Sequence, residues 1–534
     1  MKLIFCLLLV FALQAKPLFK ILPLNYQYKT SETGMPSHVL PKLSLTAALD
    51  EYESGAFAIH ADSAIKKLNV SCSLLKNKLT GRTISGSTIK LQMVEFVNCD
   101  STGKERLPLR FLSLRDTGVL AGHNTTYFIT LKSSDVIDTG LFQGQIKITA
   151  DGIKDSIGVS FTVLPFRLKA PDKMRFIAAI SNYGSMTEKE FRMLKNGGVD
   201  GVEFFLGKKC GVNVINNQGH VKIDMPVIDS TMKHMKSVGM RGPIFLMLGN
   251  DRKSHIEDKI CEVFPEFKMT TSEKIFGKPL IIGPIGNPRF DSLYLEAVAS
   301  IKSGIEKAGF EWIAAVMDEP MERSYQPFIE RTKLIRSRFP DLKLVGVTQG
   351  NFAFTKSLEP YTDILITAGD YTTIENLARR KGKMFSVNTF QGAANEPGCS
   401  RAIFGTRVWR YNPGIMLFWS YNWNYGDPFV EYDSEEPDRF SSILYPPREG
   451  TDGFPTETPA WIGLREAIDD WSYARMLEEL AAQKGQLSEF PIDDMKHAVG
   501  EWDFFEKEYD YPRDYSQLDT VRNQAAQAIL KLLK

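Results

Sequence analysis

The sequence has no excess of charge of either sign. Of its 534 residues, 65 are Lys or Arg and 64 are Asp or Glu, which gives a formal net charge of +1. A surface without a strong positive field has little to attract a polyanion over distance. Nucleic acid is therefore not an expected partner. The sequence does not determine the oligomeric state.

Long hydrophobic runs are missing beyond the N-terminus. The run from Leu3 to Leu13 follows Lys2 and ends before Gln14-Ala15. It is shorter than the roughly 20 apolar residues that a membrane span needs. A basic residue, a short apolar run and a small residue are typical of a secretory signal peptide. We predict a signal peptide over residues 1–15 and an exported protein, periplasmic or extracellular.

Cysteine and histidine are few, and their spacing matches no metal motif. The five cysteines after Cys6 contain no Cys-x-x-Cys pair, and the seven histidines are scattered along the chain. These patterns exclude the common zinc and redox motifs, so no metal or cofactor is expected. At most two disulfides are possible, and Cys72 with Cys99 is the pairing expected within the first domain.

Residues 24–165 contain short alternating apolar segments separated by turn residues. Ala56 to His60, Thr126 to Leu131 and Gly144 to Ala150 are examples. Such spacing, with almost no helical periodicity, is typical of an antiparallel β-sandwich. A chain of this length is expected to hold two or three domains, and the pattern changes after residue 172.

Residues 172–480 alternate short apolar strands with amphipathic helical stretches. Eight such strands are expected, at 176–180, 201–206, 243–248, 312–318, 342–347, 363–368, 383–388 and 415–419. Eight strands separated by helices predict a (β/α)8 barrel. An open doubly wound sheet is less suited, because no Gly-x-Gly-x-x-Gly turn follows the first strand. Residues 481–534 are predicted to form a C-terminal helical extension.

The fourth barrel strand ends in two adjacent carboxylates. The apolar run from Trp312 to Met317 is followed by Asp318, Glu319 and Pro320. Because proline cannot donate to a strand ladder, the strand should stop here, at the carboxyl end where barrels place their chemistry. An acidic pair is also common at ordinary surfaces, so its meaning depends on the surrounding strand ends.

The other strand ends carry amides and aromatic rings. Trp419, Tyr421 and Trp423 recur with a period of two, so in an extended chain they share a face. Aromatic faces stack on the apolar faces of a pyranose, while amides and carboxylates bind its hydroxyls. The predicted cleft is therefore typical of a sugar site.

Three motifs together resemble glycoside hydrolase family 123, a family of β-N-acetylgalactosaminidases with many uncharacterised bacterial relatives. They are the strand end at 317–320, the strand at 418–423 and the helical stretch at 464–473. The resemblance covers roughly residues 174–480. It implies an N-terminal β-sandwich before a catalytic barrel, and a glycan or glycoconjugate as substrate.

The resemblance also implies a retaining, substrate-assisted mechanism. Glu319 would be the general acid and base, and Asp318 would orient the acetamido group of the sugar. Two acids this close should differ in pKa, with Glu319 protonated and Asp318 ionised. The remaining predicted substrate contacts are aromatic wall residues and residues placed only by their position at strand ends: Trp419, Tyr421, Trp423, Asn182, Gln349, Tyr371 and Asn388.

Two alternatives remain open at this point. One is a glycosidase with a second carboxylate from another strand end, such as Glu203, Asp251 or Asp370. The other is a secreted protein that binds glycans on an inactive barrel. The preference for galacto or gluco sugars, the aglycone and the exo or endo mode do not follow from any spacing.

Overall fold

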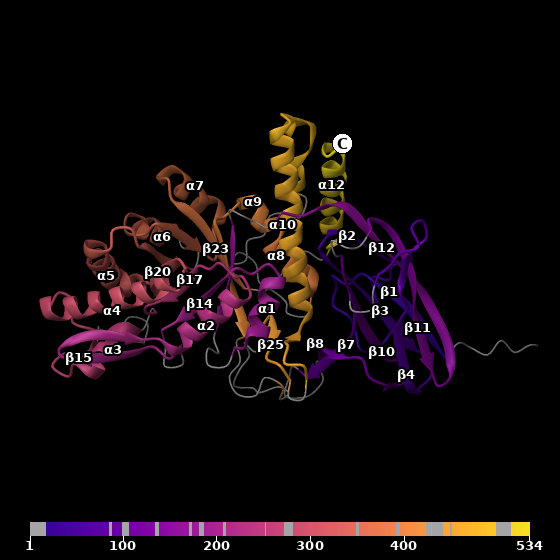
Figure 1. Cartoon of the computed structure of the whole chain (residues 1–534), viewed down its shortest axis with the longest axis horizontal. Coiled ribbons are helices and arrows are strands. Elements are labelled where there is room, and N and C mark those ends of the chain that lie inside the picture. Colours follow the sequence, from indigo (N-terminus) through magenta and orange to yellow (C-terminus); the bar gives the residue numbers. More distant parts are fainter. Residues whose placement is uncertain are drawn as a thin grey trace, which may run out of the picture.

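The computed structural model describes residues 18–84, 88–98, 106–133, 138–169, 174–180, 186–206, 210–250, 253–271, 281–348, 352–390, 396–422, 429, 442–448, 451–497 and 514–534. The predicted signal peptide lies outside these residues. The chain forms a β-sandwich and a barrel, with two long helices, α10 and α12, between them (Figure 1).

The N-terminal part is a sandwich of two sheets, as predicted. The first sheet is antiparallel, with the spatial order β1 (Phe19–Leu24), β3 (Tyr52–Ala61), β10 (Asn124–Lys132), β7 (Ile89–Asn98) and β8 (Arg106–Ser113). The second has the order β2 (Leu43–Leu49), β12 (Ile153–Arg167), β11 (Gly140–Ala150), β4 (Ile65–Cys72) and β9 (Thr117–Val119), with β5 (Leu75–Asn77) and β6 (Thr83–Ile84) beside β11. β2 and β12 are parallel, and the other pairs in this sheet are antiparallel. Alternate side chains, such as Val159, Phe161 and Val163, fill the core.

Cys72 is a free thiol, which corrects the expected pairing with Cys99. It ends β4 in the second sheet, whereas Cys99 follows β7 of the first sheet and lies outside the described residues. Burial raises the pKa of the Cys72 thiol to about 11, so it is protonated at neutral pH.

The second part is a closed barrel of eight parallel strands, which confirms the predicted fold class. The strands are β13 (Arg175–Ile180), β14 (Gly201–Phe205), β17 (Ile244–Met247), β20 (Trp312–Asp318), β21 (Lys343–Thr348), β22 (Ile364–Thr367), β23 (Met384–Phe390) and β24 (Ile415–Asn422). The helices that follow these strands are α1 (Glu188–Asn196), α2 (Pro226–Ser237), α3 (His255–Val263), α4 (Pro288–Lys307), α5 (Tyr325–Arg338), α6 (Phe352–Leu358), α7 (Tyr371–Lys381), α8 (Pro397–Phe404), α9 (Thr406–Tyr411) and α10 (Pro459–Gln483). Three small hairpins join β15 (Asn213–Asn217) to β16 (His220–Asp224), β18 (Thr270–Thr271) to β19 (Ile281–Ile282), and β25 (Leu444–Tyr445) to β26 (Thr456–Glu457).

The barrel interior is a separate apolar cluster. Its members are Ile177, Phe245, Met247, Ile313, Ala315, Val345, Val347, Ile364, Ile366, Ile415 and Leu417. Their strand neighbours belong to the larger cluster between the barrel and its helices. Because side chains alternate along a strand, these two clusters show which residues point into the barrel and which point outward.

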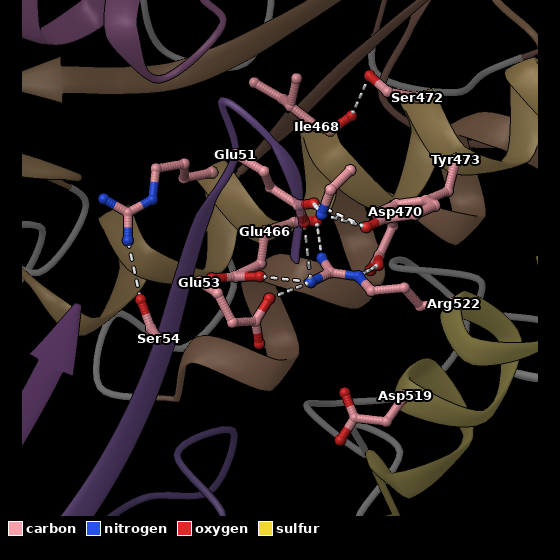
Figure 2. Close-up of polar contacts among 12 residues, drawn as sticks. Glu51, Glu53, Ser54, Glu466, Ile468, Asp470, Ser472, Tyr473, Asp519 and Arg522 are labelled. Atoms are coloured by element: carbon pink, nitrogen blue, oxygen red, sulfur yellow. Dashed lines mark hydrogen bonds and ion pairs between the residues drawn. The ribbon is translucent and has the colours of Figure 1, made fainter. Parts of the chain in front are cut away.

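Helix α10 joins the barrel to the sandwich through buried charges, together with α12 (Ser516–Leu532), which follows the short α11 (Ile492–His497). Arg522 of α12 donates to Glu53 of β3 at 2.9 Å and to Glu466 of α10 at 2.7 Å (Figure 2). It also donates to Asp470 of α10, which accepts from Arg401 of α8 at 2.7 Å. Arg522 of α12 thus joins an acid of the sandwich to two acids of α10.

No helix in the described part of the chain is long and apolar enough to cross a membrane.

Candidate functional site

The acidic pair lies at the carboxyl end of β20. Ile313 and Ala315 point into the barrel, and Val316 and Met317 both pack outward. The break in alternation coincides with a shift in the β20–β21 register between Ala315 and Met317. A bulge of this kind re-aims the residues that follow it. Asp318, half-buried, is thereby turned to the inside of the barrel mouth.

Glu319 leaves the strand at a sharp backbone turn. Its φ of 44° lies in the left-handed region, which residues other than glycine rarely adopt. The following Pro320 has no backbone N–H to donate, so strand pairing cannot continue through it. Asp318 and Glu319 therefore lie at the same rim in two different backbone conformations.

A third carboxyl group, Glu203, lies on the inside of β14. Val202 and Phe204 pack outward, so Glu203 points into the barrel, where it is 2% exposed. Burial, and secondly the charge of Asp318, raise the pKa of the Glu203 carboxyl well above its usual range. Burial within the barrel and the charge of Asp318 therefore both favour the protonated form of Glu203.

Two aromatic rings lie on the same side of the mouth. Trp419 follows the inward-facing Ile415 and Leu417 on β24. Its ring meets the ring of Phe205, at the end of β14, edge to face with centroids 5.6 Å apart. The half-buried Trp419 thus offers an apolar surface beside the carboxyl groups.

Tyr421 does not share this face, so the predicted period of two is wrong at Tyr421. Tyr421 packs in the outer cluster, and its hydroxyl donates to Glu190 of α1 at 2.8 Å. The pairing of β24 with β13 shifts register between Phe418 and Asn422, which ends the strict alternation. Tyr421 is 1% exposed and holds α1 against the barrel, where a sugar has no access.

Tyr371 is also turned away from the mouth, contrary to the prediction. It begins α7, and its hydroxyl donates to the carbonyl of Ala368 at 3.0 Å. The Arg407 guanidinium covers the ring at 4.3 Å, and the residue is 4% exposed. Tyr371 was predicted as a substrate contact because it follows a strand end, but its side chain packs in the helical layer around the barrel.

Asn388 lies where a ligand contact is possible. Phe385 and Val387 pack outward, so Ser386 and Asn388 of β23 point inward, and Asn388 is half-buried. Asp370, a proposed alternative carboxylate, precedes α7 in the left-handed conformation with φ of 48°. Four other candidates lie outside the described residues: Asn182, Gln349, Trp423 and Asp251.

Among the described residues, no group of three His, Cys, Asp or Glu side chains is arranged to hold a metal ion. The mouth instead combines carboxyl groups, an amide and aromatic rings.

A comparison with solved structures identifies the architecture. The chain superposes on a family 123 glycoside hydrolase from Clostridium perfringens, described for glycolipid glycan hydrolysis, with a TM-score of 0.71 and 14% sequence identity. The match covers 96% of this chain and 97% of that one. The chain has the fold of a family 123 glycoside hydrolase.

This family 123 fold extends over both the sandwich and the barrel. β-Glucuronidase 3 from Bacteroides uniformis matches with a TM-score of 0.30 and 10% identity over 82% of this chain and 54% of that one. The Parabacteroides merdae β-glucuronidase matches with a TM-score of 0.32 and 10% sequence identity. That match covers 80% of this chain and 52% of the other. These partial matches do not establish a shared overall fold. No protein-family model and no curated protein sequence matches the chain.

Phe205 was not predicted from the sequence, and Glu203 was predicted only as an alternative carboxylate. A signal was available, because Glu203 interrupts the apolar strand from Val202 to Phe205. A charged residue inside a buried strand requires a partner or a function. Phe205 carried no such signal, since a phenylalanine at a strand end is most often core.

Proposed function

We propose that the protein is a glycoside hydrolase that removes β-linked N-acetylhexosamine by a retaining, substrate-assisted mechanism. The observation that carries the proposal is the pair Asp318 and Glu319, adjacent in sequence at the carboxyl end of β20, with Asp318 turned into the mouth. The family 123 fold supports it, and by resemblance to that family N-acetylgalactosamine is the proposed sugar.

The proposed reaction needs no protein nucleophile. The acetamido carbonyl oxygen of the sugar forms a bond to its own C1 while the bond from C1 to the glycosidic oxygen breaks. Glu319 gives its proton to that leaving oxygen. Water then attacks C1, Glu319 takes a proton from it, and the bond between the acetamido oxygen and C1 breaks. Two inversions at C1 give net retention.

Asp318 is proposed to act on the acetamido group. An ionised carboxylate accepts a hydrogen bond from the acetamido N–H and stabilises the positive charge of the oxazolinium intermediate. The carboxylate must therefore face the sugar while the neighbouring Glu319 faces the leaving group. The positive φ of Glu319 supports this division, because the two adjacent residues differ in backbone conformation.

Of the carboxylates named for a two-carboxylate glycosidase, Glu203 fits the role poorly. A nucleophile must be ionised, whereas burial favours the protonated form of Glu203. A general acid must reach the glycosidic oxygen, whereas Glu203 is 2% exposed. The two-carboxylate hypothesis and the glycan-binding hypothesis are both tested by the experiment described next.

The test is release of p-nitrophenol from the β-N-acetylgalactosaminide, the β-N-acetylglucosaminide and the plain β-galactoside. We expect the wild type to hydrolyse acetamido sugars only, and Glu319→Gln to lower kcat by about 10²–10⁴-fold. Asp318→Asn should lower kcat with little change in KM. Turnover of the plain galactoside would contradict substrate assistance, and tight binding of N-acetylgalactosamine without any turnover would favour a binding protein.

The proposed location follows from the predicted signal peptide: the enzyme is exported and acts on a glycan or glycoconjugate outside the cytoplasm. Fractionation of cells that express the full chain would locate it. N-terminal sequencing of the exported form should show removal of residues 1–15, and a cytoplasmic protein with its N-terminus intact would contradict the proposal.

A further inference from the structure

Glu203 is a buried acid whose surroundings do not compensate a charge. It lies in the middle of β14 between the outward-facing Val202 and Phe204. No hydrogen-bond partner of its Oε1 exists within the described structure. Moving an ionised carboxylate into such a place costs far more than moving a neutral acid. The side chain is therefore expected to be neutral, with a proton that it can donate to a neighbouring group.

Among the described residues, no cation of the neighbouring strands acts on Glu203. Arg175 begins β13 and pairs instead with Asp200 at 3.8 Å. Farther along, β13 brings Ile177 inward, and β17 on the other side brings Phe245 and Met247. The next strand, β20, brings Asp318. Over the described residues, Asp318 is the charged group that acts on Glu203, and it is an anion. The negative charge of Asp318 disfavours a second negative charge on the buried Glu203, so the pair is expected to hold one proton between them.

We propose that Glu203 is a positioning residue that stays protonated and presents its O–H to Asp318. Its consequence for catalysis rests on the proposed function. A hydrogen bond to a carboxylate favours the ionised form. Glu203 would therefore hold Asp318 ionised and aimed at the acetamido N–H, while it contributes no second negative charge itself.

The burial of the two groups decides which carries the proton. Glu203 is buried within the barrel, whereas Asp318 is half-buried at its mouth. The more buried acid keeps the proton, because its charged form loses more hydration. Asp318, nearer to water and to an incoming sugar, carries the charge where the oxazolinium would form.

Two substitutions separate this role from a structural one. Glu203→Gln keeps a neutral donor, and Glu203→Leu removes the donor and leaves an apolar side chain. Ser386→Ala is the matched control, because Ser386 also points into the barrel, is 0% exposed, and has no hydrogen-bond partner for its Oγ within the described part of the chain. The measurement is kcat and KM for the β-N-acetylgalactosaminide across pH, beside Tm.

For Glu203→Gln we expect kcat within about tenfold of wild type and an unmoved acid limb of the kcat/KM profile. For Glu203→Leu we expect kcat to fall about 10²-fold or more, KM and Tm to hold, and the acid limb to move to higher pH because Asp318 loses its donor. Ser386→Ala should move none of these. The proposal is overturned if the acid limb moves to lower pH in Glu203→Gln, which would mean that Glu203 was charged. It is also overturned if Glu203→Leu leaves the limb in place.

A second measurement keeps this test independent of the proposed activity. Infrared difference spectra at pH 7 between wild type and Glu203→Gln should contain the carbonyl stretch of a protonated carboxylic acid, and Asp318→Asn should shift that band. Absence of the band would refute the protonated state of Glu203. If the wild type hydrolyses no acetamido sugar but the band is present and responds to Asp318→Asn, the proposed function fails and the pairing of the two acids stands.

Discussion

At the scale of single residues, backbone geometry separates side chains that the sequence groups together. Asp318 and Glu319 are neighbours, yet one ends an extended strand and the other is in the left-handed region. Trp419 and Tyr421 are two residues apart, yet one faces the mouth and the other the helical layer. Local register, rather than spacing, decides which of them can meet a sugar.

Tyr421 gives a prediction at this scale. Tyr421→Phe removes a buried hydroxyl and leaves Glu190 without one donor, so the free energy of unfolding should fall by about 1–3 kcal/mol. Hydrolysis should stay within about threefold of wild type, because the ring lies outside the mouth. Urea unfolding and steady-state kinetics would measure the two effects.

Trp419→Ala is the comparison variant. It should raise KM for the acetamido sugar several-fold, because the substitution removes an aromatic face that would stack on the pyranose ring. A large loss of activity in Tyr421→Phe with normal stability would return Tyr421 to the list of substrate contacts.

At the scale of elements, α10 and α12 connect the two domains by buried charge. Arg522 reaches acids from β3 and α10, all of them nearly inaccessible to water (Figure 2). Tyr473 of α10 accepts a hydrogen bond at 3.0 Å from the backbone N–H of Ala48, on the sandwich side. A buried ion pair adds little net stability, but loss of one partner leaves uncompensated charge behind.

The expected result for Arg522→Met is a fall of about 3–5 kcal/mol in the free energy of unfolding, because Glu53, Glu466 and Asp470 lose their shared cation. Lys531→Met on the same helix is the matched control, since Lys531 is 67% exposed and pairs with Glu489 at 3.5 Å. It should cost less than about 1 kcal/mol. Equal costs for the two variants in chemical denaturation would show that burial of the network does not decide its strength.

At the scale of the whole molecule, the contact between sandwich and barrel should respond to pH. Burial raises the pKa of Glu51 to about 7, against lowering by Arg522 and by hydrogen bonds from Tyr473 and Ala48; the charge of Glu466 raises it further. The usual pKa of a glutamate is 4.5. Between pH 4.5 and about 7, Glu51 is therefore protonated in the folded protein but ionised in the unfolded chain.

The sign of the effect follows from this difference. Where the folded state binds more protons, stability falls as pH rises, so the Glu51 contribution is lost between pH 4.5 and about 7. Glu51→Gln cannot ionise and should show a smaller fall in unfolding free energy from pH 5 to pH 8. The lowered pKa of Asp470 acts below this window, in the opposite direction. An unchanged fall in Glu51→Gln would contradict the assignment.

The sequence by itself determined the architecture and the location of the acidic pair. Alternation with a period of two marked the sandwich strands, and short continuous apolar runs between amphipathic helices marked the eight barrel strands. Both patterns are local properties of the chain, so both could be predicted. Pro320 and the two acids before it marked a strand end for the same local reason.

Only the tertiary structure decided which side chains meet. The register shifts beside Met317 and Tyr421 come from pairing with other strands, and no local pattern encodes them. Glu203 and Asp318 are distant in sequence and come to face the same barrel interior because β14 and β20 flank β17 in a closed barrel. Their coupling therefore depends on burial and proximity, which exist only after the chain has folded.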